Sequence, residues 1–173
     1  MLAEAGKAAA EAGVEVEWIR ADATQYRADG EFDAAICLCE GAFTLPGEHE
    51  DPVEHDLAIL RNVHGALKSG AGLVLTALNG LRTIRQFTPE DVRNGRFDPI
   101  TMVETSTMEW DGPDGKRSVT VRENSYVPRE LAVLVRRSGL EGEHIWGGTA
   151  GRFGRRPVEL DEMEIMTVAR KPS

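Results

Sequence analysis

Two groups of polar residues follow apolar segments, in positions where open α/β proteins bind ligands. Asp22 and Ala23 come directly after Val14–Ala21, which alternates apolar and polar residues before it becomes apolar. The second group, at the end of the apolar run 32–39, is Cys39, Glu40 and Gly41. Because ligands of such sheets bind outside the carboxyl ends of strands, we expect a pocket here. An aspartate after a strand is also an ordinary turn former, so Asp22 keeps that alternative.

Aromatic and basic side chains elsewhere could contact a substrate. Phe43 follows the second group, and Trp110, Tyr126 and Trp146 could line a cavity next to a predicted hairpin. For each of them the alternative is packing in a core. Three arginines in a glycine-rich loop could bind an anion or lie in a solvated turn: Arg152, Arg155 and Arg156.

The periodicity predicts the elements that position these residues. The intervals of three and four in Val53–Lys68 predict an amphipathic helix that closes at Lys68-Ser69-Gly70. Apolar runs on both sides of it, at 32–39 and 72–79, predict a right-handed βαβ unit with parallel strands. Since Phe32–Cys39 is apolar on both faces, we expect a central strand that is covered on both sides.

The remaining segments predict further helices and strands. Residues 1–12 and 128–138 are expected to be helical, and Thr88-Pro89 reads as a helix start. Residues 102–110 and 119–127 flank Asp111–Gly115, a strong hairpin signal, so 82–127 is predicted as an insertion. Strands are expected at 141–146 and 162–169. The chain 1–173 reads as one domain.

Composition excludes several classes of protein. The formal net charge is −9 over 173 residues, with 41% hydrophobic residues, which fits a globular domain. This acidic balance argues against binding nucleic acid or an anionic membrane. The apolar runs are too short to span a bilayer, and the N-terminal segment is too polar for a signal peptide. Cys37 and Cys39, the two cysteines, are placed poorly for a disulfide, so we expect a reduced, cytoplasmic protein.

The order of these segments resembles the class I S-adenosylmethionine-dependent methyltransferases. The most specific part is LRNVHGALKSGAGLVLTALN, which is similar to the family's helix, LKPGG and apolar strand, with Ser69 in place of proline. EFDAAIC looks like the strand that supports the end of the cofactor pocket. RADAT looks like the strand end whose acid, here Asp22, hydrogen-bonds the adenine amino group. The resemblance implies a three-layer, Rossmann-like α/β fold and S-adenosylmethionine as cofactor, bound at Asp22, Ala23, Cys39, Glu40 and Gly41.

The chain departs from the family at its start. The glycine-rich cofactor loop and the acid that grips the ribose are absent, so the resemblance implies a sheet that is incomplete on its N-terminal side. A gap in a parallel sheet leaves unpaired backbone groups. Either Val14–Ala21 pairs directly with Phe32–Cys39, or a second copy supplies strands. We expect a homodimer.

Three functions remain open at this point. The resemblance implies methyl transfer, and the acidic charge favours a small molecule over nucleic acid as the acceptor, with Phe43, Trp110 and Tyr126 as candidate substrate contacts. The alternatives are a noncatalytic remnant or regulatory partner, and an unrelated open α/β protein such as a nucleotide-binding module. Methyl transfer needs a general base only for nucleophiles that must lose a proton. The candidate bases are His49, His55 and Glu40, although His55 and Asp56 are expected to be capping and solvated residues, so the catalytic residues stay unknown. No metal is expected, because zinc would need two ligands beyond the cysteines.

Overall fold

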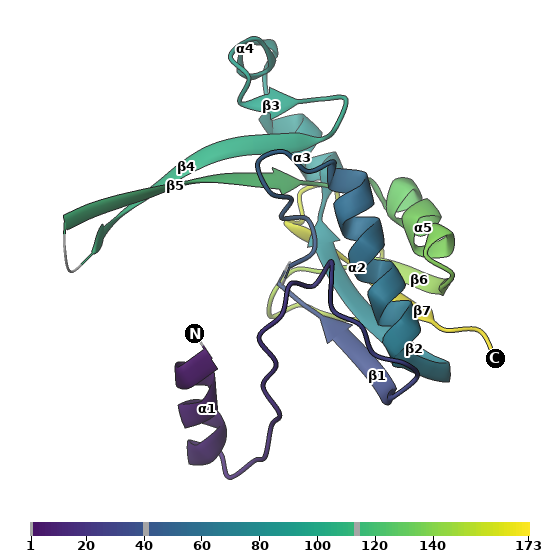
Figure 1. The fold of residues 1–173 in the computed structure, drawn as a ribbon. Helices are drawn as coiled ribbons and strands as arrows, with labels where there is room; N and C mark the ends of the chain where they lie inside the picture. The colour runs from purple at the N-terminus through teal and green to yellow at the C-terminus, as the bar shows by residue number, and fades with distance from the viewer. Residues whose placement is uncertain (1, 40–41, 113–114) are drawn as a thin grey trace.

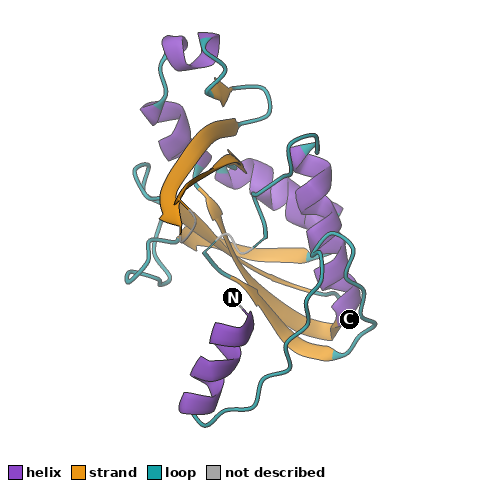
Figure 2. Ribbon diagram, turned by 60° about the vertical axis from the view of Figure 1, so that its left-hand side comes forward, coloured by secondary structure: helices purple, strands orange, loops and turns teal. Residues whose placement is uncertain are grey.

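The computed structural model describes residues 2–39, 42–112 and 115–173. Among these residues the chain forms two sheets and five helices (Figures 1 and 2). The helices are α1 (Leu2–Glu11), α2 (Pro52–Ala66), α3 (Gly80–Gln86), α4 (Pro89–Arg93) and α5 (Pro128–Arg137). The strands are β1 (Phe32–Cys37), β2 (Leu67–Leu78), β3 (Phe97–Asp98), β4 (Val103–Gly112), β5 (Gly115–Asn124), β6 (Glu141–Gly147) and β7 (Glu164–Arg170).

The main sheet has the strand order β1-β2-β7-β6. β1 and β2 are parallel, whereas β7 runs antiparallel to both β2 and β6. The predicted parallel β-α-β unit is therefore confirmed, with α2 between its two strands. Figure 1 shows α2 and α5 on one face of this sheet.

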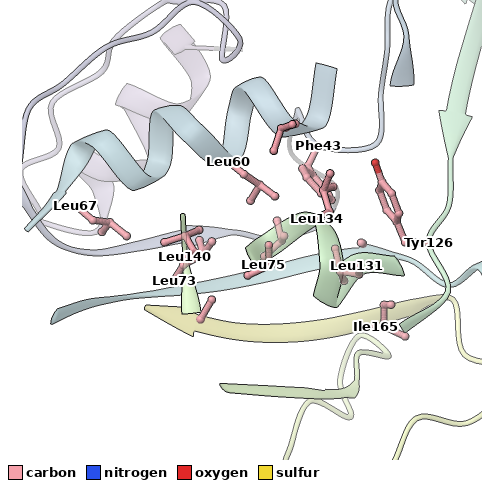
Figure 3. Close-up of a cluster of buried hydrophobic side chains, with 14 of the residues drawn as sticks. Phe43, Leu60, Leu67, Leu73, Leu75, Tyr126, Leu131, Leu134, Leu140 and Ile165 are labelled. Atoms are coloured by element: carbon pink, nitrogen blue, oxygen red, sulfur yellow. The ribbon is translucent and has the colours of Figure 1, made fainter. Parts of the chain in front are cut away.

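Apolar side chains from α2, α5 and the sheet form the core (Figure 3). Leu57 and Leu60 of α2 are at most 1% exposed, as the intervals of three and four in the sequence predict. Complete burial of each such side chain contributes about 1.5–3 kcal/mol. The sheet and α5 supply Leu73, Leu75, Leu131, Leu134, Val135, Ile165 and Ala169.

The start of α2 agrees with its sequence, but its end differs. Asp51 caps the helix by accepting a hydrogen bond from the backbone N–H of Glu54, and Pro52 occupies the first turn. The helix ends at Ala66, because Leu67 is already extended, is fully buried and pairs with Phe32. The predicted stop at Lys68-Ser69-Gly70 is wrong, since those residues belong to β2.

Two predictions for the N-terminal third are also wrong. Val14–Ala21 is not a strand, and it does not pair with β1. As a result β1 is an edge strand instead of a covered central one, and Ile36 is 74% exposed. An alternating pattern becomes a strand only when another strand supplies its hydrogen-bond partners, and none reaches Val14–Ala21 among the described residues. Helix α1, which has no buried residue, lies away from the sheet in both views (Figures 1 and 2).

The predicted hairpin is confirmed as β4 and β5, which pair from Val103–Asn124 to Gly112–Gly115. Its predicted turn residues Pro113 and Asp114 lie outside the described residues. The expected helix start is α4, where Thr88 and Asp91 form a reciprocal capping box. None of the helices in the described part of the chain is long and apolar enough to cross a membrane.

Candidate functional site

A buried carboxylate joins three segments near the carboxyl end of β1. Asp56, in the first turns of α2, is fully buried and accepts hydrogen bonds from four groups. They are the backbone N–H of Thr44 (2.9 Å), Nδ1 of His55 (2.8 Å), Nδ2 of Asn124 (3.0 Å) and the hydroxyl of Tyr126 (2.8 Å). We call these five residues the Asp56 cluster. They come from the loop after β1, the first half of α2, the end of β5 and the segment that follows β5.

Asp56 lies beyond the first turn of α2, where the helix dipole contributes little, so hydrogen bonds are the main stabilisation of its charge. Four donors replace the water that Asp56 loses on burial. An unpaired buried carboxylate would destabilise the fold, so the cluster fixes the loop and the hairpin to α2.

Thr44 is held in a conformation that its residue type disfavours. Its φ is 66°, in the left-handed region, which a β-branched residue rarely adopts. The N–H of Thr44 donates to Asp56, and its carbonyl accepts from the backbone N–H of Asn124 (3.0 Å). Such strain costs on the order of 1–3 kcal/mol and persists only where surrounding contacts enforce it.

Tyr126 connects the cluster to the sheet. Its backbone N–H donates to the carbonyl of Leu78, and its own carbonyl accepts from Gly80 (2.9 Å). A Cβ on Gly80 would lie 2.9 Å from backbone atoms of Tyr126 and Val127, so only glycine fits this approach. The ring of Tyr126 packs against Phe43, with ring centroids 5.8 Å apart.

The expectation that His55 and Asp56 are solvated is wrong. Asp56 is fully buried, and the His55 side chain is only 8% exposed. The groups that cover Asp56 lie 68 and 70 residues further along the chain. Local spacing therefore did not reveal Asn124 and Tyr126 as its partners.

Electrostatics in the cluster favour the protonated forms of His55 and Tyr126. The hydrogen bond to Asp56 raises the pKa of His55, burial opposes this, and the charges of Asp56, Glu50 and Asp22 add to the rise. Burial, together with the adjacent Asp56 charge, raises the pKa of Tyr126. The tyrosine therefore stays a donor, and Nδ1 of His55 carries the proton that Asp56 accepts.

Asp22 lies near the cluster, and its charge acts on His55. It is exposed, and its Oδ1 accepts from the hydroxyl and the backbone N–H of Thr24, both at 2.8 Å. These bonds lower the pKa of Asp22. Both donors use Oδ1. Among the described residues no group donates to Oδ2, so this oxygen is available to a ligand. The carbonyl of Ala23 accepts from Asn62 of α2 (2.8 Å), which holds this turn against the helix.

The other predicted cofactor residues lie further along the chain. Cys39 is exposed, has a φ of 52°, and donates its backbone N–H to the hydroxyl of Thr76 at 2.9 Å. Glu40 and Gly41 lie outside the described residues.

A groove of about 390 Å³ lies between residues 19–26, β1 and α2. Ala21 and Ala23, on either side of Asp22, contribute to its wall together with Tyr26, Ile36 and Val63. Its volume falls within the range of ligand pockets, roughly 300–1,000 Å³.

The structure brings two of the three predicted substrate residues together. Phe43 and Tyr126 are in contact and almost fully buried, whereas Trp110 is 48% exposed near the hairpin tip. Trp146 lies on β6 and stacks on His144 with ring centroids 4.6 Å apart. Arg156 forms an ion pair with the buried Glu162, instead of lying free in a solvated turn. No group of three potential metal ligands occurs in residues 2–39, 42–112 and 115–173.

No family model and no curated protein sequence matches this chain. Solved structures do match. The CcbJ methyltransferase from Streptomyces caelestis is 18% identical, with a TM-score of 0.69 over 96% of this chain and 72% of that protein. An S-adenosylmethionine-dependent methyltransferase from Clostridium acetobutylicum is 12% identical, with a TM-score of 0.68 over 99% of this chain and 71% of that protein.

A third similar structure holds ligands. It is the 1,6-didemethyltoxoflavin-N1-methyltransferase of Burkholderia thailandensis, with 1,6-didemethyltoxoflavin and S-adenosylhomocysteine bound. It is 14% identical, with a TM-score of 0.55 over 98% of this chain and 57% of that protein. The predicted Rossmann-like architecture is confirmed: this chain has the fold of the class I S-adenosylmethionine-dependent methyltransferases.

Proposed function

We propose that this protein transfers a methyl group from S-adenosylmethionine to a small molecule. The observation that carries the proposal is the structural match to methyltransferases over almost the whole chain. The toxoflavin methyltransferase, crystallised with its small-molecule ligand, supports an acceptor of that size. The net charge of −9 argues against nucleic acid as the acceptor.

The residues around Asp22 fit the adenosine part of the cofactor. Oδ2 of Asp22 is an exposed acceptor for an exocyclic amino group, and the apolar groove beside it offers a wall for a purine ring. Cys39, Glu40 and Gly41 follow the strand end next to this region and are proposed as further cofactor contacts. When bound, S-adenosylmethionine supplies a methyl group on a positively charged sulfur. The lone pair of an acceptor would attack the methyl carbon, and the sulfur would leave.

The inserted region 82–127 is proposed to form the acceptor side of the site. It contributes Tyr126, whose ring contacts Phe43 next to the Asp56 cluster. Trp110 lies on β4 of the hairpin and is 48% exposed. The whole chain, 1–173, is proposed to act as one domain.

Calorimetric titration with S-adenosylhomocysteine tests this function. We expect binding in the micromolar range, and we expect Asp22→Asn to weaken it by roughly tenfold, which corresponds to one hydrogen bond of about 1.4 kcal/mol. Asp29→Asn is the matched control, because Asp29 is an exposed aspartate of the same segment. Absence of heat at millimolar ligand would refute a working cofactor site in this chain.

The alternative is a noncatalytic protein that acts through an interface, and the free edge of β1 favours it. Ile36 and Phe32 on this edge strand are 74% and 42% exposed. Ile19, which lines the groove, is 52% exposed, and the adjacent Trp18 is 45% exposed. An unpaired strand edge with apolar side chains invites another strand.

We propose that a second copy of the chain covers the edge of β1 in a homodimer. Sedimentation analysis should then show twice the chain mass of 18.9 kDa, and a monomer at working concentration contradicts the dimer.

A further inference from the structure

Within residues 2–39, 42–112 and 115–173, one ring nitrogen of His55 is fixed by a hydrogen bond and the other has none. Nδ1 lies 2.8 Å from Asp56. Nε2 lies 3.8 Å from a carboxylate oxygen of Glu50, which is too long for a hydrogen bond. Because the side chain is only 8% exposed, water has limited access to the ring. A nearly buried imidazole that a carboxylate orients through one nitrogen can exchange a proton at the other.

The residues behind this pair are held rigidly. Asp56 is itself fixed by Thr44, Asn124 and Tyr126, so the imidazole has one orientation. Two buried polar atoms of the cluster, Oγ1 of Thr44 and Oδ1 of Asn124, have no hydrogen-bond partner in the part of the chain that the structure describes, and neither has Oγ of the adjacent Ser125. Buried polar atoms of this kind are normally completed by water or by a ligand.

The charges around His55 are mainly acidic. Asp22 belongs to the segment before β1, Glu50 to the loop after it and Asp56 to α2, and all three act on the imidazole. Arg122 of β5 is close to Glu50 in the same loop, where its guanidinium donates to the carbonyls of Gly47 and Glu50. This arrangement favours a cationic group near Nε2.

We propose that Nε2 of His55 is the general base that removes a proton from an amine acceptor, with Asp56 as its positioning residue. This inference rests on the proposed methyltransferase function and adds the class of acceptor to it. The acidic neighbours attract the acceptor as an ammonium ion. An ammonium has no lone pair for attack, so the proton must leave first.

The proposed step balances in atoms and charge. The ammonium gives one proton to Nε2, and the neutral amine then uses its lone pair to attack the methyl carbon. A carbon–nitrogen bond forms while the carbon–sulfur bond breaks, and its electron pair goes to sulfur. The products are a methylated ammonium and S-adenosylhomocysteine, and the imidazolium returns its proton to water.

Three measurements test the inference. First, calorimetry with S-adenosylhomocysteine on the protein and on His55→Gln should give the same affinity, because the histidine acts on the acceptor. Second, methyl transfer from radiolabelled S-adenosylmethionine to benzylamine, tyramine and cadaverine should fall by roughly 10²–10⁴-fold in kcat for His55→Gln. His64→Gln, at the opposite end of α2, is the matched control and should keep the activity.

The third measurement follows protonation without turnover. An NMR titration of the imidazole should place the pKa of His55 above 6.5, and Asp56→Asn should lower it. Methylation should rise with pH through the same value, because the base must be neutral. If Asp56→Asn does not fold, Tyr126→Phe replaces it, and it should alter the same titration.

Each negative result overturns a different part of the proposal. Binding of S-adenosylhomocysteine without methylation of any of the three amines overturns the acceptor class. Methylation that is unchanged in His55→Gln overturns the base. Absence of cofactor binding refutes the methyltransferase function itself, which the first measurement detects separately.

Discussion

The hydroxyl of Tyr126 provides the sharpest test of the Asp56 cluster. Tyr126 is 2% exposed, and its hydroxyl donates to Asp56 at 2.8 Å. Tyr126→Phe keeps the ring and its contact with Phe43, so it removes one donor without opening a large cavity. A hydrogen bond to a charged group contributes about 1.5–3 kcal/mol, and its loss leaves a buried carboxylate with three donors.

We therefore expect Tyr126→Phe to lower the free energy of unfolding by about 2 kcal/mol. For a chain of this size, 1 kcal/mol corresponds to a shift in Tm of roughly 2–4 °C, so the expected decrease is about 4–8 °C. Urea unfolding followed by circular dichroism measures the first quantity, and a thermal scan measures the second. The slope of the urea transition should not change, because the surface exposed on unfolding is the same.

Tyr26→Phe is the matched control for this experiment. Tyr26 is half-buried in the groove wall, and its hydroxyl has no hydrogen bond among the described residues, so its loss should change stability by less than about 0.5 kcal/mol. Equal stability of the two variants would refute the argument that Asp56 depends on its donors.

Three further predictions concern other parts of the fold. Gly80→Ala should destabilise the protein by about 1–3 kcal/mol in urea unfolding, because its Cβ would lie 2.9 Å from backbone atoms, whereas Gly154→Ala, with open space around it, should be neutral. Burial opposes ionisation of Glu162, but the hydrogen bond from Arg156 lowers its pKa below the ordinary 4.5. Stability from this pair should be present above pH 4.5 and lost as pH falls through the folded-state pKa, and acid unfolding of Glu162→Gln should lack that loss. The raised pKa of His55 has the opposite sign: its contribution is complete below pH 6.5 and disappears as pH rises through the folded-state value, as stability curves of His55→Gln should show by their flatter pH dependence.

Local patterns predicted the elements whose stabilising contacts are close in sequence. The intervals of Leu57 and Leu60 identified α2, and the glycines around residue 113 identified the hairpin. The parallel pairing of β1 with β2 followed from the helix between them. These features depend on periodicity and turn chemistry, which a sequence displays directly.

Features that depend on distant segments were missed or misjudged. An apolar strand such as β1 reads as central, yet its position depends on which strands are present to pair with it. Asp56 reads as a surface residue at a helix start, because its covering groups, Asn124 and Tyr126, belong to the end of a hairpin and the segment after it. The cofactor prediction at Asp22 came from resemblance, and the structure adds the free carboxylate oxygen that makes it testable.

The attachment of the hairpin has a consequence for protein engineering. Residues 124–126 hold its base through Thr44, Asp56 and Leu78, whereas most residues of β5 nearer the tip are exposed. The tip can therefore be lengthened, shortened or exchanged as a module without disturbing the core. A library of hairpin tips on this base should yield folded proteins, and under the proposed function their acceptor preferences should differ.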